Sequence, residues 1–254
     1  MHVCLQLLKR DLLLFFRSFS GNFFDTLCLF FTNVIVFSYF MLGEGLKESY
    51  GSFLLIGAIA SFGLFDIIGK VSVLLLDIHG DKNISYILTL PIKSTNVFLV
   101  MGISWALASA LLTLPLFFVG KILLFHRFDL HAISYIKLIP MYITINIFFG
   151  FFSLWLSGMI KGLQNLGSIF MRFINPLFMF GGYFYSWETL YKFSPALAYL
   201  NLINPMLYVM EGMRSAALGG DYLPFFACIL TLWGFNILLA WHGCKRLKVI
   251  LDCI

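Results

Sequence analysis

The sequence predicts an all-α integral membrane protein with six transmembrane helices. Hydrophobic residues make up 61% of its 254 residues, and its mean hydropathy is +0.94. Charged residues make up only 11%, whereas about 25% is usual in a soluble domain. With about 20 residues for each span and connectors between them, this length accommodates roughly six spans. We therefore expect a single membrane domain that covers residues 1–254.

The first predicted element is an amphipathic helix over residues 1–22. Its basic and polar side chains share one arc of a helical wheel: Gln6, Lys9, Arg10 and Arg17. Apolar residues fill most of the opposite side, which suits a helix that lies in the headgroup layer of a membrane. We expect Gly21 and Asn22 to interrupt this helix before the first span begins. The alternative is that residues 1–22 simply extend that span.

Six apolar runs predict the spans. They are residues 23–42, 50–68, 97–119, 138–160, 166–187 and 224–243. The second helix is expected to continue to residue 76, so that spans one and two occupy residues 23–76. Spans three to five occupy residues 97–187, and Pro115 predicts a kink in the third. Residues 244–254 form a basic tail after the last span.

The distribution of basic residues predicts the orientation. Of the 17 Lys and Arg residues, eleven lie in segments assigned to the inner side of the membrane and six in segments assigned to the outer side. Cytoplasmic loops carry such an excess of positive charge. Both chain termini and residues 77–94 are therefore expected in the cytoplasm. The net charge of +5 is scattered among apolar spans, which argues against a nucleic-acid partner.

Residues 77–94 form a polar segment between two apolar runs. Either Asp81 or Asn83 can cap a short helix there, and Pro91 is expected to end it. Three apolar residues fall on one face of this helix at i, i+3 and i+4: Ile84, Ile87 and Leu88. This stripe favours a docking element whose apolar face is free to bind a partner. The alternative is a solvated connector between two spans, which is usually shorter.

Residues 188–223 are predicted to re-enter the membrane from outside. The segment is too long for a structureless loop and too apolar for solvent. Pro195 and Pro205 divide it into short pieces. Such pieces fit half-helices that dip into the outer leaflet while they pack against the rest of the protein.

The last of these half-helices follows Asn204 and Pro205. Glu211 and Arg214 stand three residues apart within it, and we expect a helix whose polar end faces outward. The Glu211–Arg214 pair is expected to be structural. The alternative is that it faces a translocation exit.

The sequence contains no catalytic motif that we can assign. Residues 63–70 faintly resemble a phosphate-binding loop, but Val71 stands where Ser or Thr would bind magnesium. The five cysteines form no CxxC pair, so we expect free thiols and no metal site. Asp66 and Lys70 stand four residues apart and are expected to form a structural ion pair. We therefore expect no ATP hydrolysis by this chain.

Three parts of the chain together resemble the permease subunits of type-2 ABC exporters, a group that includes polysaccharide, nodulation-factor and drug exporters. They are KRDLLLFFR at 9–17, KNISYILTLP at 82–91, and GGYFYS at 181–186 with LINPMLYVMEGMR at 202–214. The first resembles the elbow helix of the family, the second its coupling segment and the third its outer re-entrant region. In the second, Ile84, Ile87, Leu88 and Pro91 match the family pattern in type. Lys82, Asn83, Ser85 and Leu90 depart from it.

The resemblance implies two copies of this chain and two copies of a separate ABC ATPase, together with membrane lipids. The ATPase would bind ATP and Mg, and this chain would bind no cofactor. The residues implied to couple the two subunits are Asp81, Asn83, Ile84, Ile87, Leu88 and Pro91. The resemblance further implies export of a lipid-linked, glycan or amphipathic substrate across a bacterial inner membrane.

Two other functions remain open at this point. An integral-membrane enzyme that acts on lipids would need clustered His, Asp, Glu or Cys residues at the headgroup level. A passive channel or an assembly scaffold would work without ATP.

Overall fold

The structure is a computed structural model that describes residues 2–40, 49–125, 128, 133–160 and 162–252. Every regular element in these ranges is a helix, which confirms the predicted all-α class. The longer helices are α1 (His2–Ile35), α2 (Ser49–His79), α4 (Ser94–Thr113), α6 (Tyr135–Ser157) and α12 (Phe225–Asp252). The shorter ones are α3 (Asn83–Leu88), α5 (Leu116–Leu124), α7 (Leu166–Ile169), α8 (Asn175–Met179), α9 (Trp187–Phe193), α10 (Pro195–Asn201) and α11 (Pro205–Ala217).

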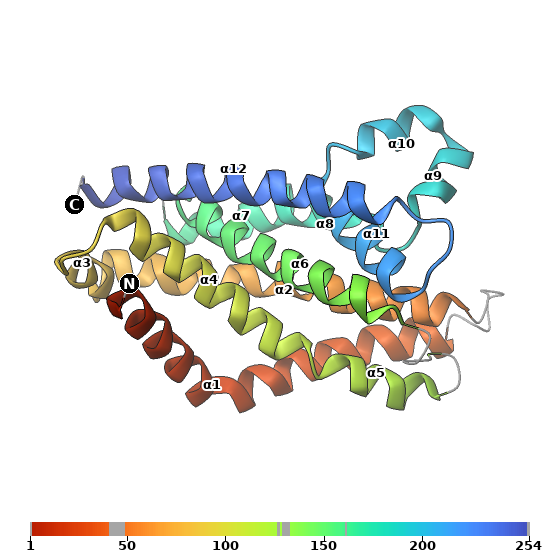
Figure 1. Ribbon diagram of the computed structural model, residues 1–254, viewed down its shortest axis with the longest axis horizontal. Helices are drawn as coiled ribbons and strands as arrows, with labels where there is room; N and C mark the ends of the chain where they lie inside the picture. The colour runs from red at the N-terminus through yellow and green to blue at the C-terminus, as the bar shows by residue number, and fades with distance from the viewer. Residues whose placement is uncertain (1, 41–48, 126–127, 129–132, 161, 253–254) are drawn as a thin grey trace.

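The long helices run beside one another along the long axis of the molecule (Figure 1). Both chain termini lie at one end, together with α3. The helices α9, α10 and α11 lie at the opposite end (Figure 1). The arrangement therefore separates the 77–94 segment from the 188–223 region by the length of the spans.

Four helices in the described ranges are long and apolar enough to cross a membrane. They are Tyr50–Ile78, Ser94–Leu124, Tyr135–Ser157 and Phe225–Leu251. They correspond to the second, third, fourth and sixth predicted spans. The third divides at Pro115 into α4 and α5, which confirms the predicted kink. The other two predicted spans fall short of this measure, so the total of six stays a prediction.

The first predicted boundary is wrong. Gly21 and Asn22 do not interrupt the helix, because α1 continues from His2 to Ile35 and is followed by a π-helical turn at Val36–Phe40. Instead α1 changes direction about halfway along its length (Figure 1). A glycine costs a helix only about 1 kcal/mol relative to alanine. In a membrane an unsatisfied backbone group costs several kcal/mol, so the hydrogen-bonded helix prevails.

Two further boundaries also differ from the prediction. The fifth apolar run is irregular, with a 3₁₀ turn at Leu163–Asn165 and a π-helical turn at Phe170–Ile174, and its last helix ends at Met179 rather than at residue 187. Gly182 follows with φ of +79°, a conformation that ends helices. The predicted basic tail is no separate segment, because α12 continues without a break to Asp252.

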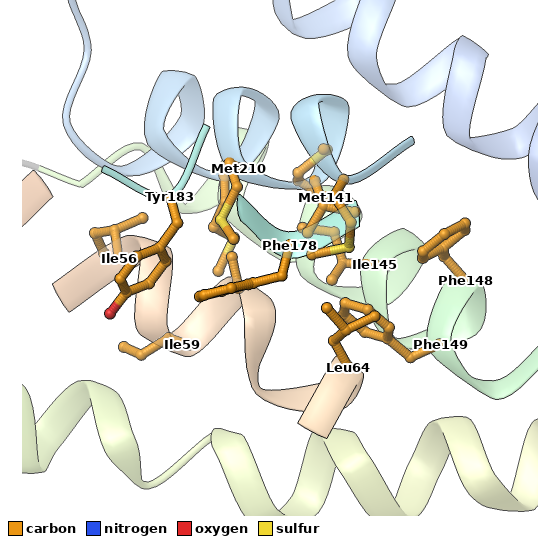
Figure 2. Packing of buried hydrophobic residues seen from close by; sticks show 14 of the residues in the cluster. Ile56, Ile59, Leu64, Met141, Ile145, Phe148, Phe149, Phe178, Tyr183 and Met210 are labelled. Carbon is orange, nitrogen blue, oxygen red and sulfur yellow. The ribbon is translucent and has the colours of Figure 1, made fainter. Parts of the chain in front are cut away.

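The main core lies between α2, α6, α8 and α11. Figure 2 shows the side chains that meet there: Ile56, Ile59 and Leu64 from α2, Met141, Ile145 and Phe149 from α6, Phe178 from α8 and Met210 from α11. At the contact between α4 and α6, small residues let the two helix backbones approach closely. A Cβ atom on Gly150 of α6 would lie 2.3 Å from the carbonyl oxygen of Gly102 in α4. Such backbone approach is how membrane helices gain contact area.

Candidate functional site

The short helix α3 is attached to the end of α2 by a carboxylate. Asp77 accepts hydrogen bonds from the backbone N–H groups of Asn83 at 3.1 Å and Ile84 at 2.8 Å. These are two of the donors that the first turn of a helix leaves unpaired. The prediction that Asp81 or Asn83 caps α3 is therefore wrong. The residue before the helix is Lys82, in a left-handed conformation and without a side-chain cap.

The apolar face of α3 is covered by this chain itself. Ile84 and Ile87 are both buried, and Leu88 is partly buried. Ile84 belongs to a buried cluster with residues of α2, α4, α6 and α12, while Ile87 packs with Leu7 of α1 and Val97 of α4. The expectation that this stripe is free to dock is therefore wrong. The 3.6-residue period located the stripe, but the spans of this chain are what it contacts.

The opposite face of α3 is exposed. Tyr86 lies on this face and is 72% exposed. Other residues of the segment are also exposed, among them Asp81, Lys82, Asn83, Thr89 and Pro91. The helix ends at Leu88, before Pro91. The 77–94 segment thus presents one aromatic ring within a polar surface, on a helix that three spans hold in place.

The basic side chains of α1 lie near this segment on a face of their own. Lys9, Arg10 and Arg17 are exposed and line a single shallow groove with Gln6. Arg10 also pairs with Asp11 at 2.7 Å. These positions fit the predicted polar arc, whereas the role of α1 at a membrane surface stays a prediction.

Asp66 and Lys70 form the predicted ion pair at 2.7 Å. The Lys70 ammonium also donates to the Ser109 hydroxyl at 2.5 Å and to the Trp105 carbonyl at 3.1 Å. Ser109 and Trp105 belong to α4, so one cation joins α2 to α4. A charge inside an apolar span is stable only with such partners.

At the other end of the molecule, Arg214 of α11 is fully buried. Its guanidinium donates to the carbonyl oxygens of Phe53 at 3.3 Å, Gly182 at 2.6 Å and Tyr183 at 2.7 Å. It also lies 3.5 Å from the centre of the Phe53 ring. A cation over an aromatic face is attracted by the ring. The arginine therefore joins α11, α2 and the 181–186 turn.

Glu211 completes this buried cluster. Its carboxylate accepts from the N–H groups of Trp187 and Leu223, both at 3.1 Å, and lies 4.0 Å from the Arg214 guanidinium. With 13 residues, α11 is too short to span a membrane. Burial raises the pKa of the Glu211 carboxyl, and the charge of Arg214 and the two N–H donors oppose that rise.

These contacts correct one expectation about α11 and support another. The polar end of this helix does not face outward, because both charged side chains are fully buried. Their backbone partners fit the structural role expected for the pair. Asn204 caps the helix by accepting from the Met206 N–H at 2.9 Å, and it donates to the Leu177 carbonyl at 2.9 Å. Pro205 follows in the first turn, where a missing N–H does no harm.

The sequence did not indicate three of these features. Asp77 caps a helix that begins six residues later, whereas a cap is normally sought next to the first turn. Tyr86 does not stand out in the sequence, because the apolar stripe on the other face of the helix is the stronger pattern. The acceptors of Arg214 are backbone carbonyls, which have no signature in the sequence. The resemblance groups the motifs at 181–186 and 202–214 as one region, and in the structure Arg214 joins the two.

Within the described part of the chain, no three His, Cys, Asp or Glu residues lie close enough to hold a metal ion.

A family model described as ABC-2 type transporter matches residues 2–218. No curated protein matches the chain.

Proposed function

The chain belongs to the ABC-2 type transporter family, and on that premise we propose that it is the permease of an exporter driven by a separate ABC ATPase. Membership makes the chain a multi-pass transport subunit that is not itself an ATPase. The energy for transport must then enter from a partner. The proposal places that partner, which binds ATP and Mg, against α3.

The observation that carries this proposal is the way in which α3 is attached. Asp77 ties its first turn to the end of α2, and Ile84 and Ile87 pack it against α1, α2 and α4. A partner that pushes on α3 therefore pushes on several spans at once. A connector held only at its two ends would transmit much less of that movement.

The contact surface for the ATPase is the exposed face around Tyr86. An aromatic ring surrounded by polar groups is typical of the centre of a protein–protein interface. Asp81, Asn83 and Pro91 lie on the exposed surface and contribute to the contact. Ile84 and Ile87 act indirectly, because they hold α3 in position.

The substrate proposed is a lipid-linked, glycan or amphipathic molecule, which passes between two copies of this chain. Two copies of the ATPase complete the assembly. The protein lies in a bacterial inner membrane with both termini in the cytoplasm. The shared position of α3 and both termini at one end, and the excess of basic residues in the segments assigned to that side, support this orientation.

The test is affinity purification of the tagged chain from membranes of its own host, followed by detection of an ABC ATPase with a phosphate-binding loop. Replacing Tyr86 by Ala should lower the recovered ATPase at least several-fold, because interface aromatics dominate binding energy. The matched control is Tyr199→Ala, an exposed tyrosine at the opposite end. Equal recovery with both variants would contradict the role of α3. Transport by the purified chain without any ATPase would contradict the proposed energy source.

A further inference from the structure

A cavity of about 590 Å³ lies between α1, α2, α3 and α4. Pockets that hold small molecules commonly measure about 300–1,000 Å³. Its wall includes five charged side chains: Arg10, Asp11, Asp66, Lys70 and Asp77. All five groups take part in ion-pair or capping contacts, yet the Arg10 and Asp66 side chains keep 48% and 28% of their surface exposed. The cavity therefore offers charge of both signs to a ligand.

Most of the remaining wall is apolar, and the polar exceptions are Ser18, Asn22, Asn83 and Ser104. Apolar side chains from all four helices contribute to it, among them Leu14 of α1, Val73 of α2, Ile84 of α3 and Val100 of α4. Val73 is 67% exposed although it belongs to a long apolar helix, α2, and lies in its last third. A wall with charged groups and a mainly apolar surface matches a molecule that itself has a polar head and an apolar chain.

The position of the cavity points to one source of such a molecule. It adjoins α3 and the basic part of α1, at the end of the molecule that carries both termini. The positive-inside distribution assigns this end to the cytoplasmic side. An amphipathic basic helix there lies at the level of the lipid headgroups. The nearest amphipathic molecules are then lipids of the inner leaflet.

We propose that this cavity binds an inner-leaflet phospholipid with a zwitterionic headgroup. Arg10 bonds the phosphate, since guanidinium and phosphate form strong paired hydrogen bonds. Asp66 accepts from the ammonium group, and the first part of one acyl chain lies along Val73 and Val100. Three carboxylates against two cations in the wall disfavour an anionic lipid. The inference concerns binding alone and does not depend on the partner ATPase.

The experiment measures lipid bound to the delipidated full chain in detergent by native mass spectrometry. Dioleoyl phosphatidylethanolamine is the probe, and dioleoyl phosphatidylglycerol and dioleoylglycerol are compared with it. We expect one phosphatidylethanolamine for each chain, retained several-fold better than either of the others. Val73→Phe fills the cavity and should lower this binding several-fold. The matched control is Leu76→Phe, a residue of the same helix that is 55% exposed and does not line the cavity.

A second pair of variants tests the headgroup. Arg10→Gln should lower phosphatidylethanolamine binding several-fold, whereas Arg17→Gln should not, because Arg17 lies outside the cavity wall. Unchanged melting temperatures exclude loss of fold as the cause. Equal binding by Val73→Phe and Leu76→Phe would overturn the site. Equal binding of dioleoylglycerol or phosphatidylglycerol by the unaltered chain would overturn the zwitterionic headgroup.

Discussion

The helices α3 and α11 lie at opposite ends of the molecule and use the same chemical device. In each case one carboxylate accepts two backbone N–H groups: Asp77 from Asn83 and Ile84, and Glu211 from Trp187 and Leu223. The surroundings differ. Asp77 is half-buried beside exposed residues, whereas Glu211 is fully buried. Water can take over the hydrogen bonds of the Asp77 carboxylate, because it is partly exposed. It cannot do so at Glu211, which is fully buried.

The contribution of such a carboxylate to stability therefore depends on its surroundings as well as on its two hydrogen bonds. A hydrogen bond contributes only about 1 kcal/mol when solvent can substitute for it, and its loss costs more when the partner is left buried and unpaired. At α11 a buried arginine adds three more backbone contacts. We therefore expect α11 to be a fixed part of the fold. We expect α3 to be able to move when a partner subunit acts on it.

The largest expected effect is at Arg214. Replacing it by Met removes the donor that binds three backbone carbonyls and leaves the buried Glu211 carboxylate without a nearby positive charge. Breaking a buried charge pair in this way costs about 3–5 kcal/mol. We expect Arg214→Met to lower the melting temperature sharply in detergent and to reduce the amount of folded protein recovered. Lys192→Met is the control, because the side chain of Lys192 is 73% exposed. A stable Arg214→Met variant would remove the contrast between the two ends.

The second effect separates the two faces of α3. Ile87→Ala removes a buried side chain that packs on Leu7 and Val97, and we expect a loss of about 2 kcal/mol in the free energy of unfolding. Tyr86→Ala on the exposed face should leave stability unchanged. Chemical denaturation of both variants gives the comparison. Equal stabilities would mean that the apolar stripe is not held by the spans.

A smaller effect is expected at Asp77. Asp77→Ala removes the cap of α3, and losing a cap costs about 1 kcal/mol. The spans should stay folded, while the amides of Asn83 and Ile84 exchange hydrogen faster. We expect more ATP to be hydrolysed for each substrate exported. Asp81→Ala, which removes an exposed carboxylate from the same segment, should behave like the unaltered chain. Unchanged exchange in Asp77→Ala would contradict the capping role.

The last prediction involves no change in stability and tests whether the two ends lie on opposite sides. After removal of the native cysteines, a cysteine at Asp221 should react with an impermeant thiol reagent from outside. A cysteine at Lys82 should react only after the membrane is opened. Both positions are exposed, so burial does not bias the comparison. Labelling of position 82 in intact cells would overturn the orientation.

Much of the fold follows from apolar runs and prolines. The helices α2, α4, α6 and α12 lie where hydropathy predicts them, and Pro115, Pro195 and Pro205 begin or divide helices as expected. These features are local, because each depends on the side chains of one segment. Gly21 and Asn22 misled the prediction, since a weak local preference for a break is outweighed by the need to pair backbone groups in a membrane.

The arrangements around α3 and α11 depend on contacts between segments that are distant in the sequence, and local patterns do not reveal such contacts. Periodicity placed Ile84 and Ile87 on one face but could not tell whether a partner or this chain covers that face. The i, i+3 spacing of Glu211 and Arg214 indicated a pair but not its burial. Asp77 and the carbonyl partners of Arg214 gave no signal, because their roles arise only when turns bring them to their partners.

The contacts of Arg214 also impose an order on biosynthesis. The carbonyl of Phe53 leaves the ribosome 161 residues before the arginine that binds it, and those of Gly182 and Tyr183 leave it about 30 residues before. The contacts at this end of the molecule are therefore completed only after most of the chain has been synthesised. A nascent chain that ends just before residue 214 contains α2 and the 181–186 turn but lacks the side chain that joins them. In such a fragment the Gly182 and Tyr183 carbonyls lack the guanidinium that binds them in the full chain.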